Sequence, residues 1–135
     1  MAKPDVLVIE PMLPMVTAAL QHDYQVHFHD NPKDPTGIPD AVRPKIRAIA
    51  TFGATGAARA VIDALPALEI VGCFGVGVDA IDTARCRERG IKVTNTPDVL
   101  TDCVADMGVA LLLAVQRRVV EGDAYVRTGK WLKAN

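Results

Sequence analysis

The segment that most constrains the fold is a short apolar run that ends in two closely spaced glycines, within Leu68 to Asp79. A run of this length, bounded by glycine, is typical of a buried parallel strand whose carboxyl end turns at the glycines. In open α/β sheets, ligands bind at that edge. Glycine lets a bound group approach the backbone closely, and successive free N–H groups form a concavity that favours anions. The segment therefore predicts a site for a small carboxylate or a phosphate.

Strand-like and helix-like segments alternate along most of the chain, which predicts βαβ units and a parallel sheet. Strands are expected at 5–9, 25–28, 47–51, 69–73 and 91–94. Helices are expected at 11–21 and 57–65, with a third that Asp79 or Asp82 caps and that runs to about Arg89. The predicted class is α/β, a flavodoxin-like parallel sheet with flanking helices.

The pattern changes after Pro97, where Thr101 or Asp102 is expected to open a long helix to about Arg118, followed by a helix at 121–129. Apolar residues lie nearly all round the first of these helices. They are Val104, Met107, Val109, Leu111, Leu112 and Val115. Such a helix is expected to be buried on several sides. The preceding residues supply too few partners for it, so we expect the chain to be the start of a longer protein.

The composition argues against several classes of partner. Fifteen basic and sixteen acidic residues leave a net charge of −1, which gives no electrostatic footprint for nucleic acid or an anionic membrane. The longest apolar run, Val109 to Val115, is too short to span a bilayer, and the N-terminus shows no secretory leader. Three cysteines at unrelated spacings favour reduced thiols. We therefore expect a soluble, cytoplasmic protein.

Two glycine-bearing loops, Gly53–Gly56 and Gly75–Gly77, follow consecutive expected strands. Those strands are neighbours in a flavodoxin-like sheet, so both loops would line one cleft. Either loop alone could be only a tight turn, but two of them at one sheet edge favour a binding site. Each hydrogen bond from a backbone N–H to a carboxylate there contributes about 1.5–3 kcal/mol.

The second loop also matches the dinucleotide fingerprint G-x-G-x-x-G/A over residues 75–80, with Asp98 downstream. The fingerprint belongs after the first strand of its unit, whereas this loop follows the fourth expected strand. The acidic residue should also end the next strand, where Thr94 and Asn95 stand instead. We interpret the match as accidental.

Three histidines, His22, His27 and His29, raise the question of a metal site, since the last two would share one strand face. A metal also needs a clustered third ligand. Histidines on an edge strand are more often partly solvated surface residues, so we predict no metal site. Cys73 ends a buried strand and is expected to behave as a small hydrophobe.

With these residues in place, the chain resembles the start of a D-isomer-specific 2-hydroxyacid dehydrogenase of the hydroxypyruvate and glyoxylate reductase kind. The likeness covers the whole chain and is strongest in three stretches. These are Leu65–Ile70, Gly75–Asp79 and Gly90–Asp102, with Val104–Asp106 and Arg117–Arg118 also fitting. The third stretch contains Val-Thr-Asn-Thr-Pro-Asp-Val-Leu-Thr-Asp, a run so long and ordered that chance explains it poorly.

The resemblance implies a substrate-binding domain at 1–98 and the start of a dinucleotide-binding Rossmann domain at 99–135, truncated before its G-x-G-x-x-G. It implies that NADH or NADPH, bound mainly outside this chain, reduces a small 2-oxo acid to a D-2-hydroxy acid. It also implies that the helix region 101–119 helps to form a homodimer.

The same resemblance assigns roles to individual residues. The N–H groups of Val76 and Gly77 would hold the substrate carboxylate, and Ala54 would lie against the substrate. Leu100 would shield the reacting centre, and Val104 would approach the nicotinamide.

The arginine, glutamate and histidine that perform catalysis in the family lie downstream of a position like Asn135, so the resemblance places no catalytic residue in this chain. We expect the 135-residue chain to be inactive alone. The alternative is a non-catalytic, flavodoxin-like module that binds a small acid or regulates another protein. A receiver or flavin-binding module fits poorly, because Glu10–Pro14 offers neither paired acidic residues nor a hydroxyl-rich loop.

Overall fold

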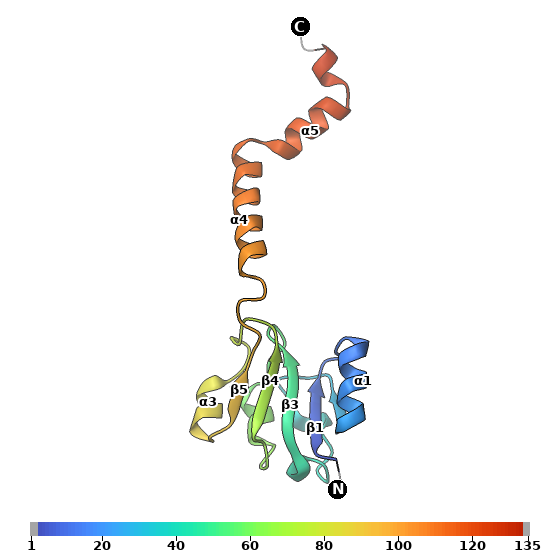
Figure 1. The fold of residues 1–135 in the computed structure, drawn as a ribbon, viewed down its shortest axis with the longest axis vertical. Helices are drawn as coiled ribbons and strands as arrows, with labels where there is room; N and C mark the ends of the chain where they lie inside the picture. The colour runs from blue at the N-terminus through green and yellow to red at the C-terminus, as the bar shows by residue number, and fades with distance from the viewer. Residues whose placement is uncertain (1–2, 134–135) are drawn as a thin grey trace. The chain divides into compact units, whose positions relative to one another are not determined.

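The computed structural model describes residues 3–133. Its internal contacts divide the chain into two compact units, with the boundary between Pro97 and Asp98 (Figure 1). The first unit holds the sheet, and the second is made of helices.

The first unit is built on five parallel strands in the order β2-β1-β3-β4-β5 (Figure 1). The strands are β1 (Asp5–Ile9), β2 (Gln25–His29), β3 (Ile46–Phe52), β4 (Ile70–Phe74) and β5 (Lys92–Thr94). The predicted flavodoxin-like α/β sheet is confirmed, and the expected strands lie within one residue of the observed ones. Because the strands all run in one direction, their carboxyl ends lie along one edge of the sheet.

Each face of the sheet has its own apolar core, because side chains alternate along a strand. Leu7, Ile49 and Val71 share one register position on neighbouring strands and are buried on one face. Helices α2 (Arg59–Asp63) and α3 (Thr83–Glu88) supply apolar partners to that core. On the opposite face, the side chains of β1 pack with α1 (Pro14–Asp23).

Helix α1 begins three residues later than the expected start at residue 11. Leu13 precedes Pro14, and the residue before a proline is pushed out of the helical region; Leu13 has φ −50° and ψ 140°. Pro14 itself occupies the first turn, where its missing N–H costs nothing. The helix therefore starts at Pro14 and runs to Asp23.

Helix α2 is shorter than the expected 57–65, because the segment before it is hydrogen-bonded to the segment before α3. Ala57, expected to be helical, instead pairs with Ile81 in a parallel bridge, and its N–H donates to the Ala80 carbonyl at 3.2 Å. Of the two expected caps, Asp82 is the one used, since its carboxylate accepts from the Arg85 N–H at 2.8 Å. These hydrogen bonds hold the segment after the first glycine-bearing loop against the segment that leads into α3.

The second unit consists of α4 (Thr101–Gln116), α5 (Val119–Arg127) and a 3₁₀ turn at Lys130–Lys133. The predicted burial of the long helix on several sides is wrong for this chain, because α4 contains no buried residue. In the part of the chain that the structure describes, nothing covers the apolar side chains of α4. Among residues 3–133, no helix combines the length and apolar character needed to cross a lipid bilayer.

Candidate functional site

The two glycine-bearing loops lie in contact at the carboxyl edge of the sheet. β3 and β4 are neighbours, and Phe52 and Phe74, their last residues, are paired in the register. A Cβ placed on Gly53 would lie 2.6 Å from the Gly77 carbonyl oxygen, too close for any side chain. The Cys73 thiol also donates to that oxygen, at 3.4 Å. The loops expected to line one cleft are therefore side by side.

Bonds from β5 and the segment after it hold the second loop by its carbonyl groups. The Asn95 amide donates to the Val76 carbonyl at 2.8 Å, and the Thr96 N–H donates to the Gly75 carbonyl at 2.9 Å. Within residues 3–133, no backbone or side-chain oxygen accepts a hydrogen bond from the N–H of Val76 or Gly77. Both residues are exposed. The loop therefore has two consecutive N–H groups without a protein acceptor, in exposed residues, an arrangement that suits an anion.

The first loop is held by bonds at its base. The Thr51 hydroxyl donates to the Gly56 carbonyl at 2.8 Å, and the Gly56 N–H donates to the Phe52 carbonyl at 2.8 Å. Gly56 has φ +69°, and a Cβ there would overlap the backbone of Ala80. Only glycine fits that position. Ala54 is exposed and directly follows Gly53, the residue that contacts the second loop.

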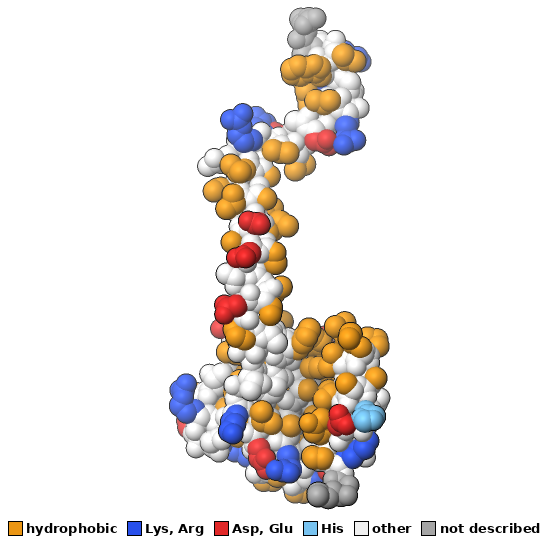
Figure 2. All heavy atoms as spheres, viewed as in Figure 1, with side chains coloured by type: hydrophobic (Ala, Val, Ile, Leu, Met, Phe, Trp, Pro, Cys, Tyr) orange, Lys and Arg blue, Asp and Glu red, His pale blue; other side chains and the backbone are white. Residues whose placement is uncertain are grey.

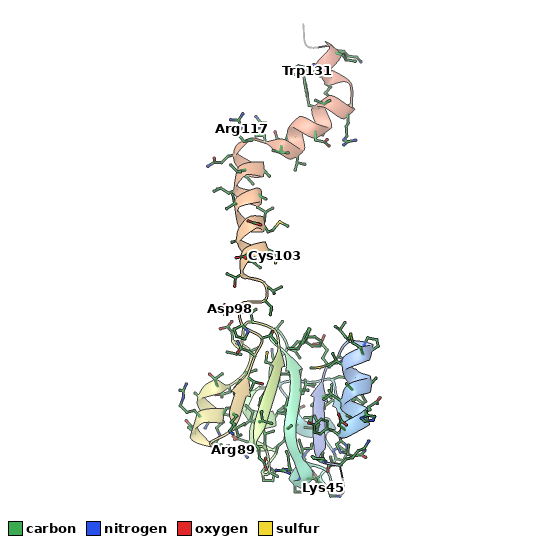
Figure 3. The ribbon with its side chains drawn as sticks, in the orientation of Figure 1. Lys45, Arg89, Asp98, Cys103, Arg117 and Trp131 are labelled. Carbon is green, nitrogen blue, oxygen red and sulfur yellow. The ribbon has the colours of Figure 1, made fainter. Side chains whose placement is uncertain are left out.

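The two loops bring no positive charge to the site. Neither loop contains a basic residue, and Lys45 and Arg89 lie at the opposite, amino-terminal edge of the sheet (Figure 3). The Asp79 carboxylate lies near Gly77, 3.3 Å from where a Cβ would stand. Binding of an anion at this edge therefore depends on backbone dipoles, and a full positive charge has to come from residues outside the two loops.

The loop does not have the geometry of a dinucleotide-binding turn, which agrees with our interpretation of its G-x-G-x-x-A pattern as accidental. A dinucleotide loop opens directly into a helix whose N-terminus holds the pyrophosphate. Here α3 begins only at Thr83, and the Asp82 carboxylate already occupies its first turn. These residues do not fit the phosphates of NAD or NADP.

Within residues 3–97, no group of three histidine, cysteine or acidic side chains is placed to hold a metal ion. Burial raises the pKa of the Cys73 thiol, so the thiol stays protonated and behaves as the small hydrophobe we expected. His27 bonds to the Asp5 carboxylate at 2.7 Å, and His29 bonds to the Asp34 carbonyl at 2.8 Å. His29 is buried, so the expected surface position is wrong for it, because the loop carrying Asp34 covers it.

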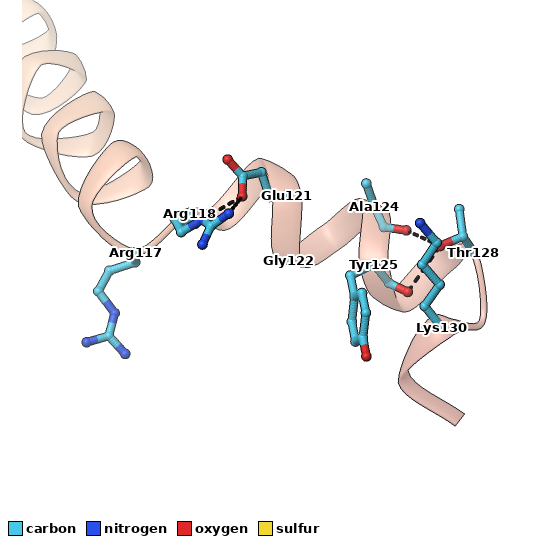
Figure 4. Close-up of a pocket in the computed structure, with 8 residues that line it drawn as sticks. All are labelled: Arg117, Arg118, Glu121, Gly122, Ala124, Tyr125, Thr128 and Lys130. Atoms are coloured by element: carbon cyan, nitrogen blue, oxygen red, sulfur yellow. Dashed lines mark hydrogen bonds and ion pairs between the residues drawn. The ribbon is translucent and has the colours of Figure 1, made fainter. Parts of the chain in front are cut away.

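Leu100 and Val104, the other two residues expected to contribute to the site, belong to the second unit. Both side chains are exposed, Leu100 at the N-cap of α4 and Val104 in its first turn. The same unit has a separate hollow beside α5 (Figure 4). Its lining residues are Arg117, Arg118, Glu121, Gly122, Ala124, Tyr125, Thr128 and Lys130. None of them belongs to the glycine-bearing loops.

A family model described as the catalytic domain of the D-isomer specific 2-hydroxyacid dehydrogenases matches residues 6–128. The chain belongs to this family.

Individual relatives give the same result. The chain is 41% identical over 133 residues to a 2-ketogluconate reductase of Gluconobacter oxydans, covering 98% of the chain and 42% of that protein. It is 56% identical over 86 residues to a hydroxyphenylpyruvate reductase of Plectranthus scutellarioides, covering 64% of the chain and 28% of that protein.

A solved structure agrees with the fold. The NADPH-dependent glyoxylate/hydroxypyruvate reductase of Sinorhizobium meliloti, in complex with NADP and malonate, superposes with a TM-score of 0.83 at 35% identity. The match covers 98% of this chain and 40% of that one. The chain therefore spans less than half the length of these three relatives.

Sequence reasoning assigned no role to Glu10, although it stands at the same sheet edge. Its carboxylate accepts a hydrogen bond from the Thr55 hydroxyl of the first loop. The available signal was its position, an acidic residue directly after the first strand. Its neighbour became visible only once the sheet order placed β1 beside β3.

Proposed function

We propose that the carboxyl edge of the sheet binds the carboxylate of a small 2-oxo or 2-hydroxy acid, of the glyoxylate and hydroxypyruvate class. The observation that carries this proposal is the pair of free N–H groups at Val76 and Gly77, on a loop with no competing acceptor among the described residues. Two such donors match the two oxygens of a carboxylate. Ala54 supplies an uncharged surface beside them.

We further propose that this binding unit is one half of an NAD(P)H-dependent reductase. In that account residues 1–98 are the substrate-binding domain, and 99–135 begin the dinucleotide-binding domain. When NADH or NADPH is bound it supplies the hydride, and its phosphates are held by residues outside this chain. Leu100 would shield the reacting carbon, and Val104 would lie toward the nicotinamide. The arginine, glutamate and histidine of the reaction would come from the rest of the protein.

The test compares two lengths of protein. The longer protein, which contains this chain followed by the remainder of such a reductase, is expected to oxidise NADH or NADPH when glyoxylate or hydroxypyruvate is added. The 135-residue chain is expected to show no turnover. Turnover by the 135-residue species itself would contradict the assignment. Acid binding without turnover by the longer protein would favour the non-catalytic, regulatory alternative.

We also propose a homodimer through the helix region 101–119. Val104, Met107, Leu111 and Val115 form one stripe along α4, and each is more than half exposed. Figure 2 shows hydrophobic side chains along this helix. A second copy of the same helix would bury such a stripe, as paired helices do in isologous dimers.

Sedimentation equilibrium tests the dimer. The unmodified chain is expected to be dimeric, and Leu111→Lys is expected to be monomeric because the lysine places a charge in the stripe. Phe28→Lys is the matched control, since it changes an apolar side chain on β2 that is 51% exposed, against 59% for Leu111. A monomeric unmodified chain, or a Leu111→Lys dimer, would refute this proposal.

A further inference from the structure

Glu10 is an exposed carboxylate held in an unusual backbone conformation at the same sheet edge. It follows β1 directly and has φ +69°, in the left-handed region that non-glycine residues seldom adopt. Its N–H donates to the His29 carbonyl at 3.1 Å, and its carboxylate accepts from the Thr55 hydroxyl. One bond to β2 and one to the first loop thus fix both the backbone and the side chain. Backbone held in this way, at the sheet edge that carries the proposed site, is a reason to look for a function.

Along the carboxyl edge of the sheet, Glu10 lies two strands away from the Val76 and Gly77 N–H groups. β1, β3 and β4 are consecutive in the sheet, so their carboxyl ends are separated by two strand spacings, about 10 Å. The first loop fills the interval: Gly53 contacts Gly77 at one end, and Thr55 bonds to Glu10 at the other. A ligand anchored at Val76 and Gly77 that extends over Ala54 therefore points toward Glu10.

The chemistry of Glu10 defines what the far end of such a ligand should be. An ionised carboxylate only accepts hydrogen bonds, so it suits hydroxyl groups. It repels a second carboxylate on the ligand. An extended six-carbon acid is about 6 Å long. With a hydrogen bond of about 3 Å at each end, it can bridge the distance between the N–H groups of Val76 and Gly77 and the Glu10 carboxylate. A two-carbon acid is too short to reach.

We propose that Glu10 is a specificity-determining residue that, among acids long enough to reach it, favours those with a hydroxylated tail over dicarboxylic acids. This inference rests on the proposed function, because Val76 and Gly77 must hold the first carboxylate. Thr55 acts as a positioning residue that holds the Glu10 carboxylate beside the first loop.

Amide-resolved NMR titration of the ¹⁵N-labelled 135-residue chain tests the proposal with three linear 2-hydroxy acids. They are glycolate, which has no tail, D-gluconate, which has a six-carbon hydroxylated chain, and D-2-hydroxyglutarate, which has a second carboxylate. D-gluconate is expected to bind about tenfold more tightly than D-2-hydroxyglutarate. In Glu10→Gln the two affinities are expected to converge to within about twofold. Glu69→Gln removes the same charge at the amino-terminal edge and is expected to keep the tenfold preference.

The outcomes separate this inference from the function on which it rests. If all three acids shift the Val76 and Gly77 amides but Glu10→Gln leaves their relative affinities unchanged, the role of Glu10 is overturned and the carboxylate site stands. If none of the acids shifts those two amides, both proposals fail. The role of Glu10 is supported only when the amides shift and the preference disappears in Glu10→Gln but persists in Glu69→Gln.

Discussion

Gly56 and Gly90 offer a direct test of how tightly the first loop is packed at the site. Both have φ +69°, so alanine at either position adopts the same strained backbone conformation. Their surroundings differ. A Cβ on Gly56 would overlap the carbonyl of Ala80, whereas a Cβ on Gly90 meets nothing within 4 Å. Comparing the two alanine variants therefore isolates the contact between the first loop and the segment before α3.

The magnitudes follow from these surroundings. Alanine in the left-handed region costs about 1 kcal/mol, which is the whole expected effect of Gly90→Ala. Gly56→Ala adds an overlap with backbone, which cannot rotate away as a side chain can, and overpacking of this kind costs about 1–3 kcal/mol more. We expect Gly56→Ala to lower the free energy of unfolding by about 3 kcal/mol and Gly90→Ala by about 1 kcal/mol.

Urea unfolding followed by far-ultraviolet circular dichroism measures both variants. The single tryptophan, Trp131, lies in the second unit, so its fluorescence is a poor reporter of the sheet. Equal losses of stability in the two variants would refute the reasoning, because they would mean that the loop has room for a side chain at Gly56.

Three further predictions concern the site, the surface charges and the thiols. Gly53→Ala is expected to weaken glycolate binding at least tenfold, since its Cβ would stand 2.6 Å from the Gly77 carbonyl and force the loops apart; unchanged binding in an NMR titration would contradict this. A hydrogen bond from Arg85 lowers the pKa of the Asp63 carboxyl below its usual 3.8. The ion pair therefore stabilises the folded state above pH 3.8, and this stabilisation is lost as the pH falls through the lower pKa of the folded state. Asp63→Asn should therefore flatten the fall in urea midpoint measured below about pH 4. The exposed Cys103 is expected to react with a thiol reagent in the native chain, and the two buried cysteines only after unfolding; rapid native reaction of all three thiols would argue against the core as described.

The sequence predicted the sheet well because short apolar strands are local signals. Their alternation with helical segments also implied a parallel order, and that order places the loops after β3 and β4 together. The residues at which the helices begin were less predictable. The start of α1 depended on the restriction that Pro14 imposes on Leu13, and the start of α2 depended on a bridge to Ile81, which is distant in the sequence.

Two features could not be derived from local patterns at all. The apolar pattern of α4 indicated a buried helix, but burial depends on what covers it, and the described chain leaves it exposed. The bond between Glu10 and Thr55 joins residues 45 positions apart. It follows from the strand order, which brings the end of β1 beside the loop after β3.

A crystal structure of the chain with oxamate, an unreactive analogue of a 2-oxo acid, is the most direct test of the carboxylate site. We predict both carboxylate oxygens within about 3 Å of the backbone nitrogens of Val76 and Gly77, with the rest of the molecule over Ala54. Oxamate bound elsewhere, or those two N–H groups bonded to protein acceptors instead, would contradict it.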